Sequence, residues 1–301
     1  KSIVLASRIL ESGDTTYVDS TIIEGIVTIN DGVDSTALFS GFTITGDYTD
    51  RGLNVTSDGN VLIEHIKVLG VGGVSFFVST ATMRDVLIKH NTRNENGGGI
   101  RIHSSTVDMV NVVIDSNATT GGYGGGGVSI YENSVVTMDS MLISNNYSNS
   151  GGGIHSDNNN TLHISNSSII GNQSEGDGGG IKEWSGSLEL INVQIDSNTA
   201  NNHGGGLFCY DSEYKAISST FNNNTTGSDG GGIYSYAGDL DYSIDSLMQC
   251  MVQGNSCNAT GGGIFIQDYQ YLYAVNTIIT DNTAGMSEDP SGYGYGGGVY
   301  S

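Results

Sequence analysis

Residues 178–207 read GGGIKEWSGSLELINVQIDSNTANNHGGGL, and this stretch decides the fold. Three glycines followed by an aliphatic residue stand at both ends, at Ile181 and again at Leu207, 26 residues later. The same signature occurs eight times, at intervals of 26 to 35 residues, with the aliphatic residue at Ile100, Val128, Ile154, Ile181, Leu207, Ile233, Ile264 and Val299. Such a period indicates one structural unit stacked many times.

A second motif keeps the same period but lies out of phase with the glycines. It consists of an apolar residue, two polar residues and an asparagine. It occupies residues 88–91, 114–117, 143–146, 169–172, 195–198, 221–224, 252–255 and 279–282. We expect each asparagine to hydrogen-bond to its equivalent in the next unit, as asparagine rows do in stacked sheets.

Residues 181–206 contain three short segments with alternating or apolar character, at 181–184, 187–190 and 192–195, and residues 196–198 then turn the chain. The stretch has no helical periodicity. Three strands that return to their starting point one strand spacing higher, about 4.8 Å, form a coil of a parallel β-helix. Glycine suits the sharp corners because it tolerates positive φ and close backbone approach.

The sequence therefore predicts an all-β, right-handed parallel β-helix with three parallel sheets. It would have about eleven coils of roughly 22–31 residues. Residues 1–301 would form a single domain. Residues 1–90 would supply less regular coils, and residues 91–301 would supply the coils with glycine triplets. We expect this domain to be a fragment of a longer protein.

Two further stretches, STIIEG (residues 20–25) and FSGFTITGDYTDRGLNV (residues 39–55), add to the recurring GGGI…NVxIxxN. With them the chain resembles bacterial right-handed parallel β-helix proteins of the pectate-lyase-like superfamily. The pairing of GGG[ILV] with [IF]xxN also resembles the repeats of chlamydial polymorphic outer-membrane autotransporters. The resemblance implies the fold but not one function, because this fold hosts lyases, hydrolases, adhesins and passive stalks.

Charge and composition restrict the partners. The net charge is −22, with only 10 basic residues, so we expect neither nucleic acid nor an anionic membrane surface as a partner. No apolar run approaches 18 residues, so we expect no membrane insertion by this segment. The acidic, Lys-poor composition is typical of an extracellular or cell-surface protein.

Cys209, Cys250 and Cys257 would be buried thiols, unless Cys250 and Cys257 form a bridge.

Aromatic residues line up when the repeats are superposed. Counting from the aliphatic residue after each triplet as an inward position, alternation places the first and third following residues outside. We call these the +1 row and the +3 row. The predicted binding residues are Trp184, Tyr210, Tyr236 and Tyr131 of the +3 row, with Phe208 and Tyr234 of the +1 row. Either the rings only stack along the sheet, or they bind a glycan or a partner. The segment 285–295 is long enough to cover them.

Asp177, His203 and Asp229 occupy the position before the triplet in three consecutive repeats. Carboxylates about 5 Å apart would admit Ca²⁺, and the histidine would admit a transition metal. The alternative is a solvated corner made of ordinary turn residues. No other cofactor is expected.

Catalytic signatures are sparse. The resemblance implies Ca²⁺-binding carboxylates with a basic residue for a lyase, or Asn-Thr-Asp, Asp-Asp and Gly-His-Gly motifs for a polygalacturonase, and the chain has none of these three motifs. The basic residues of the aromatic face are Arg101 and Lys182. If the protein is an enzyme, Lys182, Glu183 and Asp177 are the candidates. Glu183 falls at an inward position, which requires either a bulge or a paired carboxylate.

We therefore expect a non-enzymatic extracellular or cell-surface module, adhesin-like or stalk-like. Its partner would be an extracellular polysaccharide or a cell-surface molecule. The alternative is a polysaccharide lyase or glycoside hydrolase with its site on the same face. The uniform repeats favour the module, because an active site usually interrupts such regularity.

Overall fold

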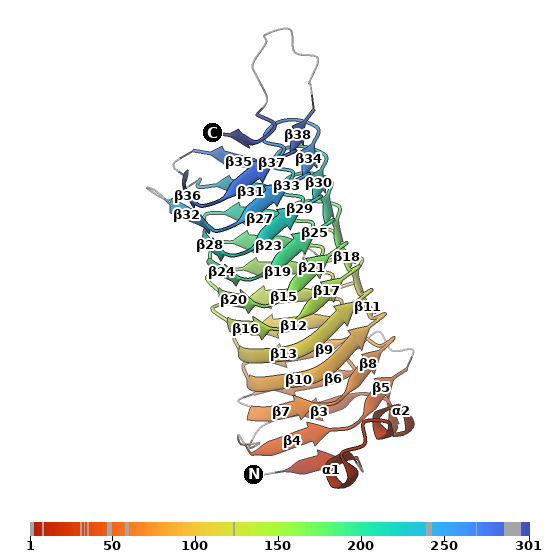
Figure 1. Cartoon of the computed structure of the whole chain (residues 1–301). Coiled ribbons are helices and arrows are strands. Elements are labelled where there is room, and N and C mark those ends of the chain that lie inside the picture. The colour runs from red at the N-terminus through yellow and green to blue at the C-terminus, as the bar shows by residue number, and fades with distance from the viewer. Residues whose placement is uncertain are drawn as a thin grey trace.

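A computed structural model describes residues 3–7, 9–30, 32, 34, 36–46, 50–57, 60–122, 124–238, 243–268, 270–285 and 296–301. These residues wind into a parallel β-solenoid whose turns stack from the N-terminal end to the C-terminal end (Figure 1). Their only helices are two single turns, α1 (Ile9–Ser12) and α2 (Tyr17–Ser20), beside the first turns. The predicted all-β parallel helix with three sheets is confirmed.

Sheet B carries the residues that follow the glycine triplets. In the described part of the chain it has 11 strands: β3 (Val27–Ile29), β6 (Leu53–Thr56), β9 (Val74–Phe77), β12 (Ile100–His103), β15 (Val128–Tyr131), β19 (Ile154–Asp157), β23 (Ile181–Trp184), β27 (Leu207–Tyr210), β31 (Ile233–Tyr236), β35 (Ile264–Gln267) and β39 (Val299–Tyr300). Equivalent residues of successive repeats pair directly, so Ile181 faces Leu207 and Leu207 faces Ile233.

Sheet A receives two consecutive segments from most turns. The first segments are β1 (Val4–Ala6), β4 (Ala37–Ser40), β7 (Asn60–Glu64), β16 (Val135–Asp139), β20 (Thr161–Ser165), β24 (Ser187–Ile191), β28 (Glu213–Ile217), β32 (Ser243–Met248) and β36 (Gln270–Val275). The second segments are β2 (Ile22–Glu24), β5 (Thr43–Thr45), β8 (Lys67–Leu69), β17 (Leu142–Ser144), β21 (Ser168–Ile170), β25 (Gln194–Asp196), β29 (Thr220–Asn222), β33 (Met251–Gln253) and β37 (Ile278–Thr280). In β10 (Thr80–Lys89) and β13 (Thr106–Asp115) the two segments are continuous.

Sheet C consists of two-residue strands between the asparagine motif and the glycine triplet. They are β11 (Thr92–Arg93), β14 (Ala118–Thr119), β18 (Tyr147–Ser148), β22 (Gln173–Ser174), β26 (Thr199–Ala200), β30 (Thr225–Thr226), β34 (Ser256–Cys257) and β38 (Thr283–Ala284). The sequence interpretation was wrong here in one respect. It gave residues 192–195 a sheet of their own, whereas β25 joins β24 in sheet A across a bend at Asn192, which has φ 56°.

The core is a continuous apolar stack inside the coils. The aliphatic residues after the triplets, Ile154, Ile181, Leu207 and Ile233, are fully buried and follow one another in register. This confirms that the aliphatic residues point inward, which is the position from which the +1 and +3 rows are counted. Since each turn contacts only its neighbours, stability is a sum over adjacent turns.

The asparagine ladder forms as predicted. Asn172 donates through Nδ2 to Oδ1 of Asn198 at 3.0 Å, and Asn198 donates in the same way to Asn224 at 3.0 Å. The backbone N–H of Asn172 also donates to Oδ1 of Asn198, and Nδ2 of Asn198 donates to the carbonyl of Ile169. The ladder therefore satisfies buried backbone groups at the corner between sheets A and C.

Each glycine of a triplet is required for a local reason. The first, such as Gly204, has φ +64°. At Gly205 an added Cβ would lie 2.5 Å from the carbonyl oxygen of Gly231, and at Gly206 it would lie 2.6 Å from that of Gly232. The second and third glycines are thus needed because the backbone of the next turn occupies the space of a side chain.

The three cysteines are free and buried, so the alternative of a Cys250–Cys257 bridge is wrong. Cys209 points into the core, as predicted.

The segment 285–295, which is long enough to cover the aromatic rows, lies outside the described residues from position 286 to position 295. Within the described residues, no helix has the length and apolar character needed to cross a membrane.

Candidate functional site

The +3 row of sheet B presents three aromatic rings in line. Trp184, Tyr210 and Tyr236 end β23, β27 and β31 and are paired in register. Their ring centroids are 4.4 Å apart between Trp184 and Tyr210 and 5.0 Å apart between Tyr210 and Tyr236. Trp184 is 38% exposed, and the two tyrosines are half-buried. The predicted outward row is confirmed as geometry, whereas its role in binding stays a prediction.

The +1 row is a second aromatic stack. Phe208, Tyr234, Phe265 and Tyr300 follow one another with centroids 5.0 to 5.2 Å apart and planes within 7° of parallel. Phe208 and Tyr234 are only 5% and 9% exposed, so the expectation that they are available to a ligand is wrong. The rings of Tyr234 and Phe265 are covered on both faces by their neighbours in the stack, and Tyr210 and Tyr236 pack against the stack from the +3 row. For the +1 row, stacking along the sheet is a sufficient explanation.

Lys182 connects the two rows. Its side chain is 9% exposed, and Nζ lies 5.1 Å from the ring centroids of both Trp184 and Phe208. The same Nζ lies 3.1 Å from Oδ2 of Asp177. An ammonium held between two rings and a carboxylate gains cation–π and ion-pair stabilisation together. Lys182 therefore fixes the position of Trp184.

Asp177, His203 and Asp229 lie next to one another at the corner before sheet B, as predicted. Nδ1 of His203 is 3.1 Å from Asp177 Oδ1, and Nε2 is 3.6 Å from Asp229 Oδ2. The imidazole ring also lies 4.7 Å from the ring of Tyr234. Burial pushes the pKa of Asp177 upward, but His203 and Lys182 outweigh it and leave that pKa below its ordinary value.

This corner is a chain of contacting side chains, with an ion pair between Lys182 and Asp177, rather than a freely solvated turn. Among the described residues, no group of three or more His, Cys, Asp or Glu side chains is arranged to hold a metal ion. The imidazole of His203 stands between the two carboxylates that would have shared a Ca²⁺ ion. The metal prediction thus gains no geometric support from the described residues.

Lys182, Glu183 and Asp177 do not form one catalytic group. Glu183 follows Lys182 in β23 and points the opposite way, into the core, where it is fully buried. Of the two reasons proposed for its inward position, the bulge is wrong. The strand pairs without a bulge to β19 and β27, and the carboxylate lies beside Ser156 of the neighbouring turn, whose hydrogen bond offsets only part of the effect of burial. Burial raises the pKa of Glu183 to about 8.

Tyr131 belongs to the +3 row but lies apart from the other three rings, because Asp157 occupies the intervening turn. It is half-buried, and its ring centroid lies 5.7 Å from that of His155. Burial raises the pKa of its hydroxyl above the ordinary value. Tyr131 is therefore not part of the continuous aromatic row.

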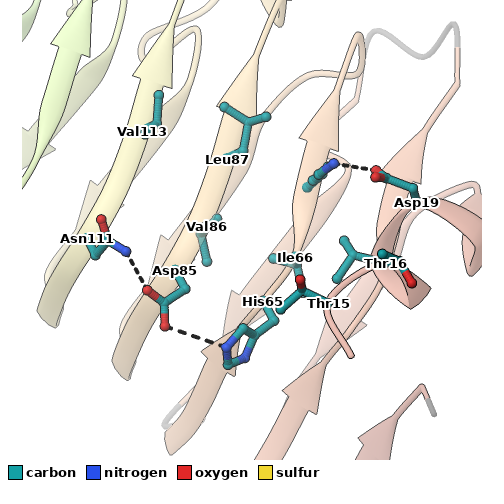
Figure 2. A pocket seen from close by; sticks show the side chains of 12 residues that line it. Thr15, Thr16, Asp19, His65, Ile66, Asp85, Val86, Leu87, Asn111 and Val113 are labelled. Atoms are coloured by element: carbon teal, nitrogen blue, oxygen red, sulfur yellow. Dashed lines mark hydrogen bonds and ion pairs between the residues drawn. The ribbon is translucent and has the colours of Figure 1, made fainter. Parts of the chain in front are cut away.

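A separate cleft of about 400 Å³ lies beside α2 on the outer side of sheet A (Figure 2). Its polar side chains pair with one another. Asp85 accepts a 2.5 Å hydrogen bond from Asn111 and lies 3.6 Å from Nε2 of His65, and Lys67 pairs with Asp19. No sequence prediction falls on this cleft.

Comparisons with known proteins recover the repeat and the fold. Residues 218–236, from just before β29 to the end of β31, match the Chlamydia polymorphic membrane protein (Chlamydia_PMP) repeat. This stretch contains one asparagine motif and one glycine triplet, so the resemblance on which the repeat was recognised is confirmed. No curated protein sequence matches the chain.

Two solved structures are similar over most of their length. The A-module of the mannuronan C-5 epimerase AlgE4 from Azotobacter vinelandii is 13% identical, with a TM-score of 0.43, over 93% of this chain and 84% of the module. The periplasmic alginate epimerase AlgG is 12% identical, with a TM-score of 0.36, over 92% of this chain and 84% of its own. At these values the likeness carries no argument about activity.

Proposed function

We propose that this chain is a non-enzymatic module of a cell-surface or extracellular protein and that its +3 row binds saccharide. The observation that carries the proposal is the partly exposed line of Trp184, Tyr210 and Tyr236 beside a +1 stack that is already buried. Stacking along the sheet accounts for the buried row. It does not require a second row that leaves a tryptophan 38% exposed.

The support for Trp184 makes the row suitable for recognition. Lys182, itself paired with Asp177, lies over the indole, and the ring of Tyr210 packs against it. A ring held in place before binding loses little conformational entropy when a ligand arrives. Rings of this kind offer apolar faces to a sugar together with polar edges. The regular spacing of turns would present equivalent contacts to successive units of a polysaccharide.

Two observations favour a module over an enzyme. Lys182 and Asp177 are paired with each other, while Glu183 points into the core. The match of one repeat to a polymorphic membrane protein favours display at the cell surface. The partner would accordingly be an extracellular polysaccharide or a glycan on another cell.

A glycan array probed with and without Ca²⁺ tests this proposal. We expect selective binding that the double variant Trp184→Ala/Tyr210→Ala loses. The matched control is Tyr271→Ala/Tyr273→Ala, which removes two exposed tyrosines of sheet A and should bind as the native protein does. Equal loss in both variants, or no binding at all, would contradict the proposal. Binding that needs Ca²⁺ would point to Asp177, His203 and Asp229, and shortened products would favour a lyase or hydrolase.

A further inference from the structure

Three of the few basic residues of this acidic chain gather at one corner. Arg51 precedes β6, Arg93 ends β11, and Arg101 belongs to β12. Burial lowers the pKa of Arg51, and repulsion from Arg93 and Arg101 lowers it further. Guanidinium groups this close repel one another unless anions or dipoles compensate them. What the corner can bind therefore depends on which of these positive charges already have partners within the protein.

Two of the three arginines are compensated by the protein. Arg51 donates through Nη1 to the carbonyl oxygen of Gly72 at 2.9 Å, and it also donates to the carbonyls of Asn96 and Gly97. Arg93 donates to Oε2 of Glu95 at 2.8 Å and lies 3.8 Å from Oδ1 of Asp50. Both carboxylates lie at Arg93, and Arg51 is held by carbonyl oxygens alone, so the three guanidinium groups together keep a net positive charge.

Arg101 is the third guanidinium group of this corner. Among the described residues its guanidinium has no hydrogen-bond or ion-pair partner, and its Nε is buried. It lines an open cleft of about 410 Å³ together with Asn94, Glu95, Asn96 and Gly122. Glu95 hydrogen-bonds to Arg93 and forms no ion pair with Arg101, although the two charges act on each other through space.

A second buried donor lies at the same place. The hydroxyl of Tyr131 is buried close to the side chains of Ser129 and Asn96; burial raises its pKa, and hydrogen bonding with these two residues offsets part of that rise. A Cβ added at Gly124 would lie 2.4 Å from this hydroxyl oxygen and 2.7 Å from Cβ of Asn96, so the hydroxyl lies beside the residue that lines the cleft. The buried Nε–H of Arg101 has no partner among the described residues, and buried donors without partners are rare in folded proteins and call for an explanation.

We propose that this corner, formed by Arg101, Tyr131 and Asn96, binds the carboxylate or sulfate group of an acidic ligand. A planar guanidinium matches such an oxyanion with two parallel hydrogen bonds, and the phenol and amide groups can supply further donors. The chain as a whole repels anions, since its 32 acidic residues outnumber its 10 basic ones. A recognised acidic group is thereby directed to this corner.

The site is independent of the proposed saccharide row. Arg101 lies three turns before Lys182 in the same row of sheet B, through Ser129 and His155. At about 4.8 Å a turn, roughly 14 Å separate the corner from Trp184. Loss of ligand at one site therefore does not imply loss at the other.

Titration of the whole chain with sodium glucuronate, at constant ionic strength, tests this inference. Glucose is the uncharged control, and inorganic sulfate is a second probe. We expect a saturable shift of the Arg101 Nε–H signal in ¹H–¹⁵N spectra with glucuronate or sulfate, and none with glucose. By calorimetry, Arg101→Gln should weaken binding about tenfold or more, Arg101→Lys should weaken it less, and Tyr131→Phe should weaken it severalfold.

The matched control is Arg84→Gln, which removes an exposed arginine of β10 in sheet A and should leave the affinity unchanged. Thermal unfolding of each variant would show that the fold persists. The inference is overturned if neither anion shifts the Arg101 signal, or if Arg84→Gln and Arg101→Gln weaken binding equally. Dependence on Arg101 with either probe supports it, and the tighter probe identifies the preferred oxyanion.

Discussion

At the residue scale, Glu183 shows what alternation in a strand can and cannot predict. Its inward position follows from the register of β23, and the structure places it there. The surroundings of its carboxylate could not be predicted, because they depend on which side chains three neighbouring turns bring into the core. Likewise, alternation placed Phe208 and Tyr234 outside the core but did not show that stacking would bury them.

We predict that Glu183 makes the protein less stable as pH rises. Its pKa of about 8 in the fold lies above the ordinary 4.5, so the folded state retains a proton that the unfolded state releases. The contribution of Glu183 to the free energy of unfolding is full below about pH 4.5. It falls by up to about 1.4 kcal/mol per pH unit toward pH 8. Burial also raises the pKa of Asp245, to about 7, so its contribution ends at lower pH.

Denaturant midpoints at pH 7 and pH 8 isolate the effect of Glu183. The native midpoint should fall across this interval, and that of Glu183→Gln should stay nearly level. The control is Glu189→Gln. The hydrogen bond from Lys215 lowers the pKa of Glu189, so its contribution is constant above pH 5. A native midpoint that does not change from pH 5 to pH 8 would refute this account of Glu183.

At the element scale, each asparagine of the ladder hydrogen-bonds to backbone groups as well as to the next asparagine, which the motif alone does not predict. Asn198 accepts from the N–H and Nδ2 of Asn172 and donates to Ile169 and Asn224. Asn198→Ala leaves several buried groups without partners, so we expect a loss of about 3 kcal/mol or more. Urea unfolding should show no comparable loss for Asn201→Ala, whose side chain is exposed. Equal stability of both variants would mean that water replaces the ladder.

We predict that Leu207→Ala costs about 2–5 kcal/mol, because it leaves a cavity in a fully buried stack. The damage should be local, since each turn contacts its neighbours only. Hydrogen exchange should accelerate mainly in β23, β27 and β31. Ile191→Ala, at a position 41% exposed in sheet A, is the control and should change little. Unchanged exchange in Leu207→Ala would show that the inward row has been assigned to the wrong residues.

Sheets A and B could be predicted, but sheet C could not. Four- and five-residue strands such as β23 and β24 contain enough residues to alternate visibly. A two-residue strand such as Thr199–Ala200 has no periodicity to detect, so it was taken for part of a turn. The glycine triplets marked the corner correctly, because close approach of the next turn excludes any side chain there.

At the scale of the whole molecule, stacking converts one repeat into rows of equivalent side chains. The fold could be predicted from the period alone, because two motifs locked at one interval allow little else. The binding sites could not, because neither pairing nor burial follows from spacing. Lys182 and Arg101 occupy the same +1 row. Lys182 is enclosed and paired, whereas Arg101 has no partner among the described residues.

The emission of Trp184 tests the central claim most directly, since this residue is the sole tryptophan of the chain. Titration with a panel of neutral and acidic oligosaccharides should shift that emission saturably for at least one of them. Tyr210→Ala should abolish the response while the fold persists, because the lost ring lies outside the core stack. A broad panel that leaves the emission of Trp184 unchanged would contradict saccharide binding and leave stacking along the sheet as the explanation of both aromatic rows.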